Sequence, residues 1–181
     1  IHREAQRLID LVNDIIKLSR LDEGGHMAQW ETVDLYALAQ AVEKQLSAAA
    51  EAKQVTMTLA GGPAQVRGVP QILEEVLYNL CDNAVAYNRP GGSVTVTVSA
   101  GAAEVRVQVR DTGVGIPPDA RQRVFERFYR VDKSHSTPGT GLGLSIVKHG
   151  TAYLGGRVEL ESEVGVGSTF TLIFPAAPEN T

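Results

Sequence analysis

The stretches Ser93-Val-Thr-Val-Thr-Val-Ser99 and Glu104-Val-Arg-Val-Gln-Val-Arg110 alternate strictly between apolar and polar side chains. Because successive side chains of a strand point to opposite faces, this alternation is typical of strands with one buried face. The short connection between the two stretches predicts a hairpin. Residues 157–162 and 168–174 predict a second, C-terminal hairpin.

Helical segments surround these hairpins. Residues 35–53 are rich in Ala and Gln, and Pro70 stands at the favoured first-turn position of a helix that runs to about residue 87. A further helix is predicted over residues 142–154, and short strands are predicted at residues 32–35, 55–59 and 65–67. Since strands outnumber helices and occur mostly in hairpins, the sequence predicts an α+β fold. We expect an α/β sandwich whose mixed or antiparallel sheet is covered by helices.

Composition excludes several classes of protein. The chain has 181 residues, of which 43% are apolar and 21% charged, which is typical of a folded protein of one to one and a half domains. Its net charge of -4 argues against general nucleic-acid binding. No apolar run approaches the ~18 residues that cross a bilayer, so we expect a soluble, cytosolic domain. The single cysteine, Cys81, excludes an internal disulfide and is expected to be a packed thiol.

The N-terminal segment predicts one long amphipathic helix that ends at Gly24-Gly25. Its apolar stripe follows alternating four- and three-residue steps through Ile1, Ala5, Leu8, Val12, Ile15 and Ser19, and Leu11, Leu18 and Leu21 widen it. This spacing is that of a coiled coil, so the stripe is expected to pack on another helix. The partner helix is not adjacent in the sequence, which suggests that the chain is part of a longer protein.

Three glycine clusters follow the central helix: Asp111-Thr-Gly-Val-Gly-Ile116, Gly139-Thr-Gly-Leu-Gly-Leu144 and Gly165-Val-Gly-Ser-Thr169. Each alone is equally well explained as a plain turn. The second opens a predicted helix, and helix amino ends offer free N–H groups to an anion. It is neither a Walker loop nor a dinucleotide fingerprint, because no Gly-Lys-Ser/Thr follows and Leu144 stands where a glycine would be required.

Asn79 and Asn83 lie four residues apart and therefore on one face of the predicted central helix. An isolated pair of this kind is more often exposed to solvent. Here the neighbouring residues are apolar, so at least one of the two is expected to border a polar cavity. An amide oxygen is a suitable ligand for Mg²⁺, whose other ligands are usually waters and substrate phosphates.

Four motifs, in this order, resemble the N, G1, F and G2 boxes of bacterial sensor histidine kinases. They are Asn79-Leu-Cys-Asp-Asn83-Ala-Val-Ala-Tyr87, Asp111-Thr-Gly-Val-Gly-Ile116, Phe125-Glu-Arg-Phe-Tyr-Arg130 and Gly139-Thr-Gly-Leu-Gly-Leu144. The resemblance covers residues 28–175 and implies the Bergerat-type ATP-binding fold, shared with gyrase, Hsp90 and MutL. In that fold helices cover one face of a mixed sheet. The F and G2 motifs also resemble the phosphate-sensing, PhoR-like subgroup.

The resemblance implies that the chain binds ATP and Mg²⁺. The implied ATP-binding residues are Asn79, Asn83, Tyr87, Asp111, Gly113, Gly115, Ile116, Arg130, Thr140, Gly141, Leu142, Gly143, Leu144 and Thr169. Asp111 would accept a hydrogen bond from the adenine amine, and guanine would be disfavoured by ~1–3 kcal/mol because it presents an acceptor there. Asn83 would hold Mg²⁺, assisted by Asn79, and Tyr87 would pack near the base or ribose. The two glycines after Asp111 would let the backbone approach the base, and backbone N–H groups of the G2 motif would bind the triphosphate.

Residues 117–140 would form the ATP lid, which is locally basic. Arg130 stands where relatives place an arginine that contacts phosphate. Arg121 and Arg123 are expected to be solvated, while Phe125 and Phe128 are expected to pack the lid against the core.

Two positions depart from the pattern of the kinases. Ala86 replaces the usual lysine, so one phosphate contact is missing, and Arg89 and His135 are the candidates to compensate. ATP-hydrolysing relatives carry a glutamate base where this chain has Asn79. Without a carboxylate to activate water, the site is expected to hold ATP for transfer to another nucleophile. Glu75, one turn earlier, remains a weak candidate base.

Residues 1–25 resemble the second helix of the dimerisation hairpin of these kinases, whose first helix carries the phosphoacceptor histidine. His2, His26, His135 and His149 lack the surrounding motif, so we expect that the chain binds Mg·ATP but does not autophosphorylate alone. With the first helix absent, Leu8, Leu11, Ile15 and Leu18 are expected to be exposed and to cause self-association.

The resemblance further implies a homodimer in the intact protein, a response regulator as partner, and a cytoplasmic position in a membrane protein. The alternatives are a degenerate nucleotide-binding switch without phosphotransfer, favoured only by Ala86, and a gyrase- or Hsp90-like ATPase.

Overall fold

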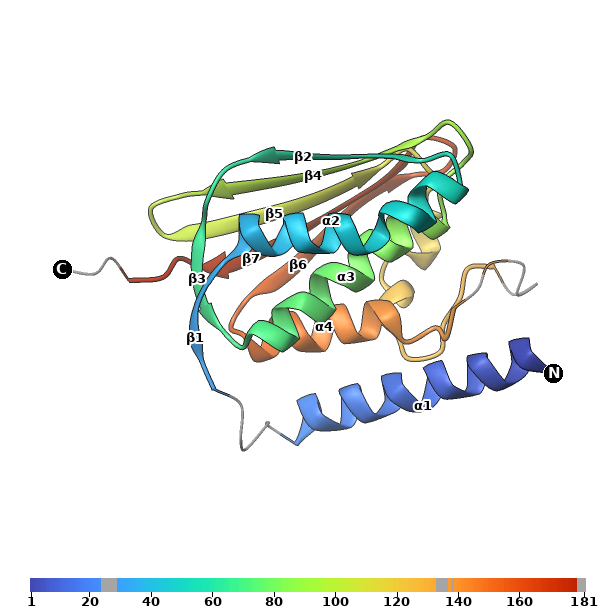
Figure 1. The fold of residues 1–181 in the computed structure, drawn as a ribbon, viewed down its shortest axis with the longest axis horizontal. Coiled ribbons are helices and arrows are strands. Elements are labelled where there is room, and N and C mark those ends of the chain that lie inside the picture. Colours follow the sequence, from blue (N-terminus) through green and yellow to red (C-terminus); the bar gives the residue numbers. More distant parts are fainter. Residues whose placement is uncertain (24–28, 133–136, 138, 179–181) are drawn as a thin grey trace.

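The computed structural model describes residues 1–23, 29–132, 137 and 139–178, and Figure 1 shows its arrangement. The helices are α1 (His2–Asp22), α2 (Leu35–Ala52), α3 (Pro70–Ala86) and α4 (Gly143–Tyr153), and 3-10 turns lie at Pro118–Ala120 and Arg123–Phe125. The strands are β1 (Glu31–Asp34), β2 (Thr56–Gly61), β3 (Gln65–Gly68), β4 (Ser93–Ala100), β5 (Glu104–Asp111), β6 (Arg157–Glu163) and β7 (Gly167–Pro175). Every strand and helix predicted from the sequence is therefore present, with ends shifted by at most two residues. The Gly24-Gly25 stop, His26, His135 and part of the predicted lid lie outside the described residues.

The main sheet has the strand order β2-β4-β5-β7-β6. The β4–β5 hairpin predicted from the alternating stretches pairs Val96 with Val109, and β5 and β6 both pair with β7 in antiparallel orientation. Only β2 runs parallel to its neighbour, β4, so the sheet is mixed as expected. A separate two-stranded ribbon joins β1 to β3.

The two faces of the sheet differ in chemistry. The buried face carries the valines Val94, Val96, Val98, Val105, Val107 and Val109. Helices α2, α3 and α4 cover this face (Figure 1), and they contribute most of the remaining core. The opposite face carries Thr97, Arg106 and Gln108 around a shallow polar hollow. The predicted sandwich, with helices on one face of the sheet, is confirmed.

Local sequence explains where the helices begin. Asp34 caps α2, because its side chain accepts hydrogen bonds from Tyr36 N at 3.0 Å and from Ala64 N at 3.1 Å. Pro70 occupies the first turn of α3, as predicted. Cys81, on α3, is buried, and burial raises the pKa of its thiol to about 12. It is a packed thiol, as expected.

Helix α1 lies outside the sandwich and runs beside α4 (Figure 1). It contacts the domain through a small apolar cluster of Leu18, Leu142 and Ile146, with Leu11 partly buried beside them. The expectation that Leu11 and Leu18 are exposed is therefore wrong, because this face of the helix packs on the start of α4.

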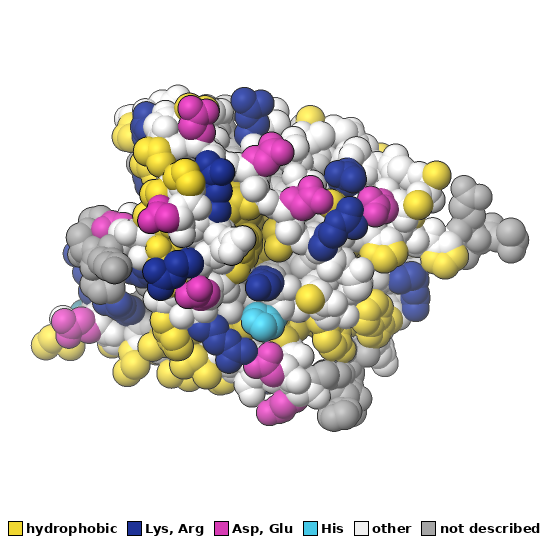
Figure 2. Space-filling view, turned by 180° about the vertical axis from the view of Figure 1, so that it is seen from behind, with side chains coloured by type: hydrophobic (Ala, Val, Ile, Leu, Met, Phe, Trp, Pro, Cys, Tyr) yellow, Lys and Arg dark blue, Asp and Glu magenta, His cyan; other side chains and the backbone are white. Residues whose placement is uncertain are grey.

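The rest of the α1 stripe remains exposed. Its apolar side chains with large exposed fractions are Ile1, Leu8, Ile9, Val12, Ile15 and Ile16. In Figure 2, hydrophobic side chains gather along the lower edge, where α1 lies. Among the described helices, none has the length and apolar character required to cross a membrane.

Candidate functional site

A cavity of about 480 Å³ opens between α3, the loop after β5, the start of α4 and the inner face of α1. It brings together residues from all four motifs. The predicted residues that line it are Asn79, Asn83, Tyr87, Asp111, Gly115, Ile116, Arg130, Thr140, Gly141, Gly143 and Leu144. Segments more than 50 residues apart in sequence thus form one site.

Three predicted residues do not line this cavity. Thr169 was placed wrongly: it lies on the open face of the sheet, in the polar hollow beside Thr97, and its neighbour Ser168 lines the cavity. Successive side chains of β7 point to opposite faces of the sheet, so Thr169 and Ser168 do not face the same side. The side chain of Leu142 is buried against α1. Gly113 is buried and is not among the residues that line the cavity.

Asp111 ends β5 at the cavity wall and is nearly buried. Its Oδ1 accepts hydrogen bonds from Gly113 N at 2.9 Å and from Ser168 N at 3.3 Å. Burial raises the pKa of this carboxyl, and the two hydrogen bonds oppose that shift. No hydrogen bond from the described residues reaches Oδ2, so this oxygen is available to a ligand that carries a donor.

The loop after Asp111 is fixed by close backbone contacts. A Cβ on Gly113 would lie 2.4 Å from the carbonyl oxygen of Tyr87, and a Cβ on Gly115, whose φ is +72°, would lie 2.1 Å from that of Glu163. Glycine is therefore required at both positions by the surrounding backbone. For Gly113, this reason differs from the expected approach of the base.

Two serines missed by the sequence analysis hold this loop against the C-terminal hairpin. Ser162 Oγ accepts a hydrogen bond from Ile116 N at 2.8 Å and donates to Gly167 O at 3.0 Å. The Oγ atoms of Ser162 and Ser168 lie 2.8 Å apart. The period of β7 was the available signal, because it places Ser168 on the same face as the buried Phe170.

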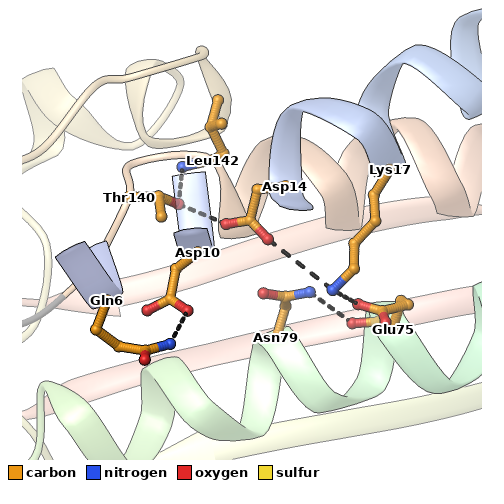
Figure 3. Close-up of polar contacts among 8 residues, drawn as sticks. All are labelled: Gln6, Asp10, Asp14, Lys17, Glu75, Asn79, Thr140 and Leu142. Atoms are coloured by element: carbon orange, nitrogen blue, oxygen red, sulfur yellow. Dashed lines mark hydrogen bonds and ion pairs between the residues drawn. The ribbon is translucent and has the colours of Figure 1, made fainter. Parts of the chain in front are cut away.

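The two asparagines of α3 have different surroundings. Asn79 Nδ2 donates to Glu75 O at 2.7 Å (Figure 3), and Asn79 Oδ1 lies 3.0 Å from where a Cβ on Gly143 would stand. This contact explains the glycine at the start of α4. Asn83 lines the cavity, and its side-chain amide makes no hydrogen bond to any described residue. Its oxygen is therefore free to coordinate a cation, so the residues present fit Mg²⁺.

The amino end of α4 faces the cavity. The residue before this helix, Leu142, provides no side-chain cap, so the first N–H groups depend on other partners. Gly141, with φ +77°, lies against Phe128, whose N–H donates to Gly141 O at 2.9 Å. The helix dipole and these N–H groups favour an anion at this end of the cavity.

The lid confirms some expectations and corrects others. Phe125 packs on the core edge-to-face against Phe170, with ring centroids 6.1 Å apart, as predicted. Phe128 was expected to pack but is 58% exposed, because its backbone adopts φ +64° beneath Gly141. Arg121 is not a free surface residue either, since its guanidinium donates to Ser162 O.

Arg123 remains exposed, as expected, and stacks on the ring of Tyr129. Arg130 lines the cavity, and its guanidinium donates to the carbonyls of Thr137 and Gly139 in the lid itself. It is thus held beside the predicted phosphate end.

The surroundings of Ala86 differ from expectation. Arg89 is exposed and does not line the cavity, so it does not replace the missing lysine, and His135 lies outside the described residues. Instead, the Lys53 ammonium donates to the carbonyl of Ala86. The lysine that lines the cavity comes from α1.

Helix α1 supplies a further wall, which the sequence analysis missed. Asp10, Asn13, Asp14 and Lys17 line the cavity. Lys17 Nζ lies 2.9 Å from Glu75 Oε2, and Asp14 Oδ2 accepts a hydrogen bond of 2.7 Å from Thr140 Oγ1 (Figure 3). Thr140 lies 126 residues from its partner, so no local pattern could have indicated this contact.

Residues 68–178 match the family of histidine kinase-, DNA gyrase B- and HSP90-like ATPases. The chain belongs to this family. Among curated members, the sensor-like histidine kinase SenX3 of Mycolicibacterium smegmatis is 38% identical over 179 residues, which cover 97% of this chain and 47% of SenX3. This chain therefore spans about half the length of that relative.

Solved structures of the family agree with the fold. Full-length ShkA in complex with AMPPNP superposes with a TM-score of 0.85 and 33% identity, and it covers 99% of this chain and 38% of ShkA. The solved structure of the mycobacterial sensor histidine kinase MprB has a TM-score of 0.73 and 29% identity, and the match covers 83% of this chain and 99% of the MprB chain in that structure. The fold is that of histidine kinase catalytic domains, as the resemblance implied.

Proposed function

We propose that this chain is the ATP-binding catalytic part of a sensor histidine kinase. The observation that carries the proposal is the environment of Asp111. Two backbone N–H groups fix one carboxylate oxygen, Asp111 lines the cavity, and no described residue donates a hydrogen bond to the other oxygen. This arrangement suits the exocyclic amine of adenine. Guanine would place an acceptor against the same oxygen, so the site favours ATP over GTP.

The opposite end of the cavity suits the triphosphate. Arg130 and the N–H groups at the start of α4 supply positive potential, and Asn83 supplies an amide oxygen for Mg²⁺. When bound, Mg²⁺ would neutralise charge on the phosphate oxygens. Tyr87 lines the same cavity and would pack near the base or ribose.

The residues around Asn79 favour transfer over hydrolysis. Asn79 is not a base, because a carboxamide does not take up a proton near neutral pH, and its NH₂ group donates to Glu75 O. Glu75 itself is paired, because its Oε2 lies 2.9 Å from Lys17 Nζ. Neither Asn79 nor the paired Glu75 is placed to activate a water, so the bound ATP would react with a histidine presented from elsewhere.

We also propose a division of the chain into two parts. Residues 28–175 would form the ATP-binding domain with the lid at 117–140, and residues 1–25 would form the second helix of a dimerisation hairpin. The exposed stripe on α1 would pair with the first helix, which carries the phosphoacceptor histidine, and with a second copy. The phosphoryl group would pass from that histidine to a response regulator. We place this chain on the cytoplasmic side of a membrane-anchored protein and propose no nucleic-acid partner.

Calorimetric titration of the chain with ATP, ADP and GTP, each with and without Mg²⁺, tests the proposal. We expect binding that is selective for adenine, stronger with Mg²⁺, and lost in Asp111→Ala. Absence of any nucleotide binding would refute it. Transfer of phosphate to a supplied phosphoacceptor helix then separates a kinase from a domain that only binds nucleotide.

A further inference from the structure

One hydroxyl group links α1 to the proposed phosphate end of the cavity. Thr140 Oγ1 donates to Asp14 Oδ2 at 2.7 Å and accepts from Leu142 N at 3.1 Å (Figure 3). A hydroxyl carries a single proton. While α1 is docked, the Thr140 proton is therefore committed to Asp14, and the Leu142 N–H is committed to Thr140. Neither donor is available to a phosphate.

Independent contacts hold the Asp14 carboxylate in this place. One turn further along α1, Lys17 pairs with Glu75 at 2.9 Å, and Leu18 is buried against Leu142 and Ile146. Near the end of the helix, Asp22 lies 2.6 Å from the guanidinium of Arg127 in the lid. The docked position of α1 thus rests on contacts along its length.

The charges around this hydroxyl would oppose a bound triphosphate. Asp10, Asp14 and Asp82 all line the cavity. The positive charge of Lys17 is offset by Glu75 at 2.9 Å and, more distantly, by Asp14 at 4.0 Å. Burial, followed by the nearby Asp14 carboxylate, raises the pKa of Asp82, which agrees with a negative potential at this wall. A phosphate entering here meets a carboxylate already bonded to the donor it would use.

We infer that Asp14 is an internal competitor for the anion-binding subsite formed by Thr140 and the start of α4. The inference rests on the proposed function, because it concerns the phosphates of the same nucleotide. Docked α1 then lowers the affinity for ATP, and ATP in turn weakens the docking of α1, since coupling between two binding equilibria is reciprocal. Adenosine has no phosphates and does not enter this competition. Asp14 thereby sets how strongly the site prefers a phosphorylated ligand.

Titration of Asp14→Ala and Asp14→Asn with Mg·ATP and with adenosine tests the inference. Loss of one charge-assisted hydrogen bond to a competing carboxylate should tighten ATP binding about tenfold in Asp14→Ala. Asp14→Asn keeps an acceptor for Thr140 but loses the charge, so its gain should be smaller than that of Asp14→Ala. The affinity for adenosine should change by less than about twofold, which is the scatter expected for a group outside its contacts.

Asp10→Asn is the matched control. It removes a carboxylate from the same face of α1 one turn earlier, but Asp10 is bonded to Gln6 at 3.0 Å, not to Thr140. A gain in ATP affinity as large as that of Asp14→Asn would overturn the inference in favour of a general charge effect. Unchanged ATP affinity in Asp14→Ala, with ATP still bound, would overturn it and leave the proposed function intact. If neither the unmodified chain nor Asp14→Ala binds ATP or adenosine, both this inference and the proposed function are overturned.

Hydrogen exchange on the unmodified chain gives a second measure. Saturating Mg·ATP should speed amide exchange over residues 5–22, because the helix loses its docking contacts. Slower exchange there on binding ATP would show that nucleotide strengthens the docked arrangement, which contradicts the competition.

Discussion

The hydroxyl oxygens of Ser162 and Ser168 lie 2.8 Å apart and join two parts of the adenine end of the cavity. Ser162 also accepts the Ile116 N–H, and the Ser168 N–H donates to Asp111. The position of the Asp111 carboxylate and the path of the loop that follows it are thus coupled through β6 and β7. Ser162 lies outside the glycine clusters, and Ser168 lies in the third cluster but was not among the predicted site residues.

Ser162→Ala should weaken this coupling. The variant leaves Ile116 N without its acceptor, at a cost in stability of about 1–2 kcal/mol. We expect lower ATP affinity together with a lower melting temperature, measured by calorimetry and thermal denaturation. Ser162→Thr retains the hydroxyl and is the control. Equal losses of ATP affinity and melting temperature in Ser162→Ala and Ser162→Thr would show that the size of the side chain at residue 162, and not its hydrogen bond, is what matters there.

Asp111→Asn should separate stability from binding. Because burial raises the folded-state pKa of Asp111, its contribution to stability is present at low pH and is lost as pH rises through that raised pKa. The asparagine variant should therefore be more stable than the parent chain at neutral pH, and the difference should shrink as pH falls below the ordinary carboxyl value. Chemical denaturation across this pH range measures it.

The same variant should bind ATP about 10–100-fold more weakly. An amide whose oxygen keeps the Gly113 and Ser168 N–H groups turns its own NH₂ group toward the adenine amine, so two donors face each other. The preference for ATP over GTP should fall as well. Retained ATP affinity and selectivity would contradict the assigned role of Asp111.

The sequence was sufficient for the fold because its information was local. The alternation of residues 93–110 defines a hairpin with a buried face, and Pro70 fixes the start of α3. Each of these depends on neighbours within a few residues. The gathering of Asp111, Asn83 and Gly143 in one cavity was instead implied by the resemblance of their motifs to those of the kinases.

The errors arose where contacts are long-range. Leu18 was expected to be exposed, but it packs on Leu142. The periodicity of the N-terminal helix does not reveal which part of its apolar stripe faces the domain. Thr169 was chosen from a motif, although the period of β7 already placed Ser168 on the buried side. The contact of Asp14 with Thr140 joins segments whose only relation is the docking of α1, so it required the structure.

Gly115→Ala should be strongly destabilising. The new Cβ would lie 2.1 Å from the carbonyl oxygen of Glu163, and the residue would keep a φ of +72° that side chains rarely adopt. We expect a loss of about 2–4 kcal/mol in unfolding free energy from strain and displaced backbone. Gly62→Ala is the control, since a Cβ there meets no atom within 4 Å. A Gly115→Ala chain as stable as the control would show that the loop adjusts freely.

Leu18→Ala should release α1 without unfolding the domain. Leu18 is 3% exposed in a cluster that is separate from the main core, whereas Ile15, three residues earlier, is 45% exposed. Truncation of a buried leucine costs about 2–5 kcal/mol, and here that cost falls on the docking of one helix. We expect faster hydrogen exchange in α1 with little change in β4, β5 and β7, and no such effect from Ile15→Ala. If α1 and the sheet lose protection together, α1 is part of the cooperative unit of the domain, and a docking equilibrium that nucleotide could shift does not exist.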